Sequence, residues 1–68
     1  MTARRYEFRV EGRLTAEERA AFLGMRITEV EPETVIDGEV IDESHLHGIV
    51  AQLHSLGITL VSAHPVPE

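Results

Sequence analysis

The clearest pattern in the chain is a strict alternation of apolar and charged side chains near its start. Tyr6, Phe8 and Val10 point to one side, and the arginines and glutamates between them point to the other. A period of two residues with one apolar side predicts a half-buried β-strand over residues 5–11, which Gly12 ends.

A short helix is predicted to follow this strand. Thr15 and Glu18 have the spacing of a capping box, in which each side chain accepts a hydrogen bond from the backbone amide of the other residue. The helix is expected to run over residues 16–23, with Leu23 and two alanines on its buried face, and to end at Gly24.

Two further strands are predicted over residues 25–31 and 34–41. They are joined by a tight turn in which Pro32 takes the first central position. Gly38 interrupts the second of these strands, where it marks either a bulge or a close backbone approach.

The strongest helical signal lies in the second half of the chain. Apolar side chains recur there at intervals of three and four residues, which is the spacing of one helical stripe. The stripe consists of Leu46, Ile49, Val50, Leu53 and Leu56. Asp42 or Ser44 can cap this helix, and Gly57 closes it. Gly48 lies inside the helix, where it either lets the sheet approach closely or leaves a small recess for a ligand.

A last strand is predicted over residues 58–63, and Pro65 and Pro67 then favour an extended tail over residues 63–68. Two strand–helix–strand units joined by a hairpin favour one α+β domain over residues 1–68. We expect a ferredoxin-like βαββαβ sandwich. Its four-stranded antiparallel sheet would have the order 4-1-3-2 and carry both helices on one face.

Composition narrows the range of functions. Six arginines, twelve carboxylates and no lysine or cysteine give a formal net charge of −6. The lack of cysteine excludes disulfides and thiolate metal sites, and the negative charge opposes binding to a phosphate backbone. No apolar run approaches the roughly 20 residues that span a bilayer, and the start lacks the apolar core of a signal peptide. We therefore expect a cytoplasmic protein without nucleic-acid or membrane partners.

The distribution of charge indicates a surface for binding. All six arginines lie in the first 26 residues, whereas residues 27–68 carry eight carboxylates. The sheet face away from the helices would then carry valines and charges of both signs. Its candidate interface residues are Arg5, Glu7, Arg9, Val35, Asp37 and Val61. A second copy would bury the valines and match arginine to carboxylate, so we expect a homodimer through this face or through the edge strand at residues 25–31. The alternative is a solvated sheet face.

The four histidines are the candidates for catalysis or metal binding. His47 and His54 share one side of a helix but lie about 10.5 Å apart along its axis, which is too far for one metal ion. Glu43 and His47 have the spacing of a helical ion pair. No serine lies in a nucleophile signature. From this absence and the histidine spacing, we expect no catalytic, metal or cofactor site. Two alternatives stay open: a weak or assembly-bridging metal site, and a small enzyme whose active site, built at a subunit interface, uses these side chains as acid and base.

Four stretches of the chain resemble a group of short, stand-alone proteins of high-GC bacteria whose function is uncharacterised. They are residues 9–14 (RVEGRL), 22–28 (FLGMRIT), 38–48 (GEVIDESHLHG) and 56–58 (LGI). The resemblance implies a ferredoxin-like fold and a bacterial cytosolic setting, and it carries over no catalytic residue. The sequence as a whole favours a non-enzymatic, self-associating module that binds a protein partner or a small-molecule effector.

Overall fold

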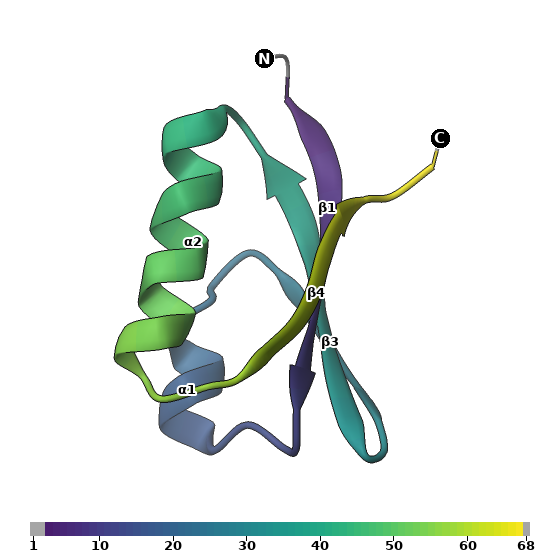
Figure 1. Cartoon of the computed structure of the whole chain (residues 1–68), viewed down its shortest axis with the longest axis vertical. Coiled ribbons are helices and arrows are strands. Elements are labelled where there is room, and N and C mark those ends of the chain that lie inside the picture. The colour runs from purple at the N-terminus through teal and green to yellow at the C-terminus, as the bar shows by residue number, and fades with distance from the viewer. Residues whose placement is uncertain (1–2, 68) are drawn as a thin grey trace.

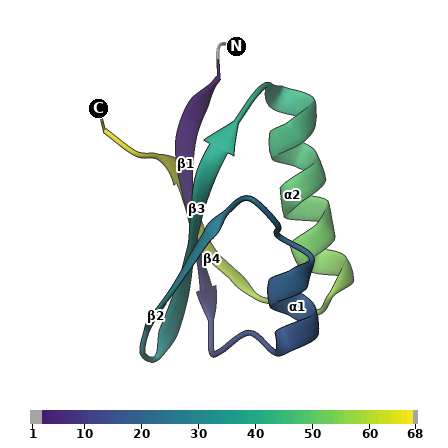
Figure 2. The same ribbon diagram turned by 180° about the vertical axis from the view of Figure 1, so that it is seen from behind.

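The computed structural model describes residues 3–67. Its main element is a four-stranded antiparallel sheet. The elements are β1 (Arg4–Glu11), α1 (Ala16–Ala20), β2 (Arg26–Val30), β3 (Glu33–Val40), α2 (Glu43–Ser55) and β4 (Leu60–Pro65). The strand order is β2-β3-β1-β4, so β1 and β3 are central and β2 and β4 are the edges. Both helices lie on the same side of the sheet (Figures 1 and 2). The predicted α+β class, the antiparallel sheet and the strand order are confirmed.

The alternation in β1 decides which side of the sheet is buried. Phe8 and Val10 are fully buried and lie opposite Ile36 and Thr34 of β3. Helix α2, the loop before α1 and the turn after α1 complete the apolar core. This core comprises Phe8, Val10, Leu14, Phe22, Ile36, Val40, Ile49 and Leu53. Thr34 is a buried polar residue, and its hydroxyl group is satisfied because it donates a hydrogen bond to the carbonyl of Gly12 at 2.6 Å.

Helix α1 is shorter than the sequence predicts. The capping box forms, because Thr15 Oγ1 accepts from the Glu18 amide at 3.1 Å and the Glu18 carboxylate accepts from the Thr15 amide at 2.8 Å. The helix nevertheless ends at Ala20, and the turn after it buries Phe22 and leaves Leu23 86% exposed. The prediction that Leu23 faces the core is therefore wrong, since the chain leaves the helical period before reaching it.

The turn between β2 and β3 lies one residue earlier than predicted. Val30 pairs with Glu33, so Glu31 and Pro32 are the two residues of the turn, and Pro32 takes the second central position rather than the first. The peptide bond before Pro32 is cis. The carbonyl of Pro32 accepts a hydrogen bond from the Gly12 amide at 2.9 Å, which connects this turn to the end of β1.

Gly38 lies opposite Tyr6 in an unbroken register, so it marks no bulge. A Cβ added to Gly38 would meet side-chain atoms of Met25 at 3.0–3.3 Å. The close approach predicted for this glycine is therefore present, but a side chain makes it rather than the backbone.

Helix α2 follows the prediction at both ends. Asp42 is the N-cap, and its carboxylate accepts from the His45 amide at 2.8 Å. The stripe buries Ile49 and Leu53 against the sheet, and Gly57 ends the helix with a φ of +73°. That backbone conformation favours glycine, because other L-residues adopt it at a cost.

Gly48 lies on the exposed side of α2, and a Cβ added there would meet nothing within 4 Å. The predicted close approach of the sheet at Gly48 is therefore wrong. We expect Gly48→Ala to raise the free energy of unfolding by about 1 kcal/mol, because alanine loses less backbone entropy in a helix. For a domain of this size, that raises the melting temperature by about 4–8 °C.

Thermal unfolding followed by circular dichroism tests this expectation. Gly57→Ala is the matched control, because its positive φ makes the same substitution destabilising by roughly 1–2 kcal/mol. An unchanged or lower melting temperature for Gly48→Ala would contradict the exposed placement of this glycine.

Strand β4 extends beyond its predicted end. It runs to Pro65, and the amide of Val66 donates to the carbonyl of Arg5 at 2.9 Å. The predicted start of the extended tail at residue 63 is therefore wrong, since residues 63–65 belong to the sheet. Glu68, the end of that tail, lies outside the described residues.

Strand β4 also differs from the prediction in which side chains face the helices. The register with β1 shifts between Arg9 and Val10, so Ser62 lies opposite Arg9 and Ala63 lies opposite the buried Phe8. A regular alternation that places Val61 on the face away from the helices would also predict Ala63 there, and that placement is wrong. A sequence pattern of period two cannot show such an irregularity, because it adds one residue to one strand only.

Candidate interaction surface

The side of the sheet that faces away from both helices is called the open face below (Figures 1 and 2). The strand registers assign its side chains. They are Arg5, Glu7, Arg9 and Glu11 of β1, Glu33, Val35, Asp37 and Glu39 of β3, Arg26, Thr28 and Val30 of β2, and Ser62 and His64 of β4. Five carboxylates thus lie among three arginines.

Asp37 connects three strands of this face. Its carboxylate accepts a hydrogen bond from Arg5 of β1 and lies 3.6 Å from Nε of Arg26 in β2. The Asp37 side chain is only 16% exposed, so the two guanidinium groups cover it. Asp37 therefore holds two positive charges at fixed places on either side of β3.

A second set of contacts centres on Arg9. Its Nε lies 3.1 Å from a carboxylate oxygen of Glu7, and its Nη1 lies 3.3 Å from one of Glu33. The other oxygen of Glu7 lies 3.6 Å from Nε2 of His64 on β4. Half-exposed ion pairs of this kind contribute at most about 1 kcal/mol each, so their main effect is to fix the positions of the charges.

Val35 lies between these two sets of contacts. It is only 9% exposed, although no helix covers this side of the sheet. The register places Arg9 of β1 on one side of it and Thr28 of β2 on the other. The aliphatic part of an arginine side chain commonly covers an apolar neighbour in this way. The open face thus has a small apolar centre within a frame of paired charges.

Five of the six predicted interface residues come together on this face, and Val61 is the exception. Val61 lies at the irregularity in β4, without a partner in the register with β1, and is 48% exposed. The structure adds Arg26, Glu33 and His64 to the charged network. The alternation of β2 could have indicated Arg26, whereas Glu33 and His64 fall in segments that the sequence assigned to a turn and a tail.

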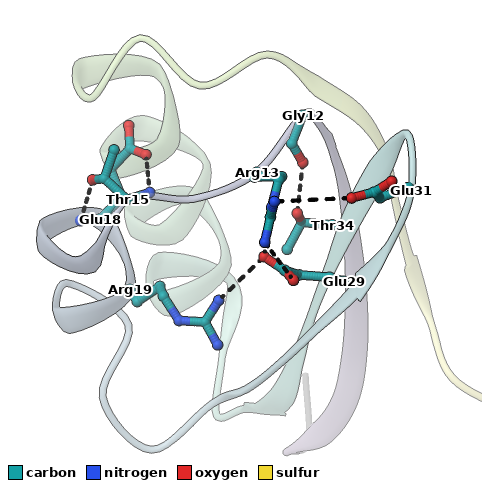
Figure 3. A network of polar contacts seen from close by, with 8 residues as sticks. All are labelled: Gly12, Arg13, Thr15, Glu18, Arg19, Glu29, Glu31 and Thr34. Atoms are coloured by element: carbon teal, nitrogen blue, oxygen red, sulfur yellow. Dashed lines mark hydrogen bonds and ion pairs between the residues drawn. The ribbon is translucent and has the colours of Figure 1, made fainter.

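A separate cluster of charges lies on the helix side, at the end of the sheet near α1 (Figure 3). Arg13 donates two hydrogen bonds to the carboxylate of Glu29, at 3.0 and 3.2 Å. Arg19 of α1 lies 3.9 Å from the same carboxylate, and Glu31 lies 4.0 Å from Arg13. This cluster connects α1 and the preceding loop to β2, so we assign it a role in stabilising the fold.

The two hydrogen bonds and the charge of Arg13 hold the pKa of the Glu29 carboxyl below its ordinary value. Ionised Glu29 therefore stabilises the folded state fully above the ordinary glutamate value of about 4.3, and this contribution is lost as the pH falls through the lower folded-state value. We expect Glu29→Gln to be less stable than the native protein at pH 7 and to approach it at pH 3.

Urea unfolding at pH 7, 5 and 3 measures this convergence. Glu31→Gln is the control, because Glu31 lies farther from Arg13 and is mostly exposed, so its substitution should change stability less at every pH. A difference between Glu29→Gln and the native protein that stays constant from pH 7 to pH 3 would contradict the assignment.

Residues 5–64 match the family described as Domain of unknown function (DUF8691). The chain belongs to this family. The DUF8691 match begins at Arg5 and ends at His64, so it includes the whole open face. No curated protein and no solved structure matches the chain.

The helix side of this DUF8691 domain carries the other histidines. His47 and His54 are both exposed on α2. A shallow hollow of about 410 Å³ lies between α2 and β4, lined by Val50, Leu53, His54, Gly57, Ile58, Thr59 and Leu60. Within residues 3–67, no three or more His, Cys, Asp or Glu side chains come together in a group that could hold a metal ion. The same part of the chain has no helix long and apolar enough to cross a membrane.

Proposed function

We propose that this DUF8691 domain is a small non-enzymatic binding module with a ferredoxin-like fold, and that it pairs with a second copy of itself through the open face. One observation carries the proposal. A whole side of the sheet is uncovered by helices, yet its charges are held in place by ion pairs around a nearly buried valine. Val30, which the register places opposite Glu33 on the same face, is 47% exposed and offers apolar area that a partner would bury. Apolar surface bordered by charged groups is the usual anatomy of a protein interface.

The mixture of charges on the open face suits a second copy as the partner. Arg5 lies opposite Glu39, and Arg26 lies opposite Asp37. A face of a single sign would repel its own copy, whereas interleaved signs allow a two-fold arrangement that sets arginine against carboxylate. The same argument supports a protein partner with a similarly mixed surface.

The features of the two edge strands favour the open face, and not a sheet edge, as the contact between two copies. Strand β2 is only five residues long and carries Arg26 and Glu29. Strand β4 is irregular opposite β1 and ends in Pro65, which lacks an amide donor. Short, charged, irregular or proline-bearing edges disfavour pairing with another strand.

The small size of the core also favours association. A single core in a chain of this length rarely supplies more than about 3–5 kcal/mol, and an interface adds to that stability by mass action.

A bacterial cytosolic setting is part of the same proposal, and it rests on the resemblance of the sequence to proteins of high-GC bacteria.

An enzyme that uses Glu43, His47 or His54 at a subunit interface is less well supported. These residues belong to α2, and the sheet separates that helix from the open face. A second copy docked on the open face would bring no side chain to them. For the small-molecule effector of the alternative proposal, the hollow beside His54 is the candidate site on the helix side.

Native mass spectrometry of the untagged protein, combined with sedimentation equilibrium over a range of concentrations, tests the proposal. We expect a species of twice the chain mass of 7.6 kDa, without added mass, in equilibrium with the single chain. A single chain at every concentration would overturn the proposed self-association. A reproducible added mass would point to an effector instead.

A further inference from the structure

We propose that protonation of His64 strengthens the dimer, so that two copies associate more tightly near pH 6 than near pH 8. This inference rests on the proposed function, because it takes the open face as the dimer surface. The affinity of the open face for a second copy would then depend on pH through His64.

His64 belongs to the network of charged side chains on the open face. His64 lies opposite Glu7 in the register, and its Nε2 is 3.6 Å from a Glu7 oxygen. The other oxygen of Glu7 is already 3.1 Å from Arg9. The His64 side chain is 48% exposed, so a second copy on the open face would remove it and Glu7 from water together.

Among residues 3–67, the charged groups around His64 lie on the open face. Strand β1 supplies Arg5, Glu7 and Arg9, and β3 supplies Asp37 one strand further away. Arg26 of β2 lies beyond Asp37. Helix α2 packs against the other side of the sheet, so its histidines do not face His64.

The balance of charge gives the direction of the effect. With His64 neutral, the five carboxylates of the open face outnumber its three arginines, an excess of two negative charges per copy. Bringing two such faces together doubles the excess in a region with less water, where uncompensated charge costs more. Protonation of His64 adds one positive charge to each copy, which lowers the excess from two negative charges to one, and it completes an ion pair with Glu7. Histidine is the side chain whose ordinary charge change falls between pH 5 and 8.

The experiment measures the dissociation constant of the dimer by sedimentation equilibrium from pH 8 to pH 6, in a buffer of constant ionic strength. We expect the constant to fall at least about threefold towards pH 6, with uptake of up to one proton per copy. His64→Gln should associate with little dependence on pH. His54→Gln, which changes an exposed histidine on α2, should keep the dependence of the native protein.

The outcomes separate this inference from the proposed function. A dimer whose dissociation constant does not change with pH, or is smaller at pH 8, would overturn the role of His64 and leave the dimer intact. The same dependence in His64→Gln as in the native protein would also overturn it. A single chain at every pH would overturn both. Circular dichroism at pH 8 and pH 6 establishes that each variant is folded.

Discussion

Phe8→Ala is expected to unfold the domain at room temperature. Phe8 is fully buried on the central strand β1, between Ile36 of β3 and Ala63 of β4. Replacing a buried phenylalanine with alanine costs about 3–5 kcal/mol, because it removes apolar burial and leaves a cavity. That loss equals the whole stability that a core of this size usually supplies.

Far-ultraviolet circular dichroism and urea unfolding measure the effect. Leu23→Ala is the matched control, because Leu23 is also a large apolar residue but is 86% exposed. Its substitution should change the free energy of unfolding by less than about 0.5 kcal/mol. If Leu23→Ala were as destabilising as Phe8→Ala, the observed end of α1 and the burial of Phe22 in place of Leu23 would be contradicted.

Arg9→Glu is expected to weaken the dimer at least about tenfold, because like charges brought together at an interface cost several kcal/mol. Arg9 lies beside Val35 and contacts both Glu7 and Glu33, so the reversal places a third negative charge between two others. The excess of negative charge on the open face also increases by two. The dissociation constant from sedimentation equilibrium at pH 7 gives the size of the change.

Arg13→Glu is the matched control for this reversal of charge. Arg13 also pairs with a glutamate, but it lies on the helix side near α1 (Figure 3). It alters the net charge of the chain by the same amount, so any general repulsion between copies is shared by both variants. Equal weakening by Arg9→Glu and Arg13→Glu would argue against a contact through the open face.

Much of the fold follows from local patterns in the sequence. The alternation of residues 5–11 and the stripe of α2 each have one apolar side, and the connections between elements are short. These features leave few arrangements in which both helices cover one side of a sheet. The central position of β1, and hence the placement of Arg5, Glu7 and Arg9 on the open face, could therefore be predicted.

The errors have physical causes that a local pattern does not contain. Phe22 replaces Leu23 in the core because α1 ends at Ala20 and the chain turns. The irregularity opposite Arg9 and Val10 changes the side on which Ala63 lies. Both features depend on how distant segments pack together. The ion pairs of Asp37 and Arg9 likewise join residues from different strands, so sequence spacing could not specify them.

An isotope-filtered nuclear Overhauser experiment on a mixture of labelled and unlabelled protein is the decisive test of dimerisation through the open face, because it detects only contacts between copies. We expect intermolecular contacts from protons of Arg9, Val35 and Thr28 on the open face. Intermolecular contacts confined to α2 or to the edges of the sheet, or none in a concentrated sample, would contradict this expectation.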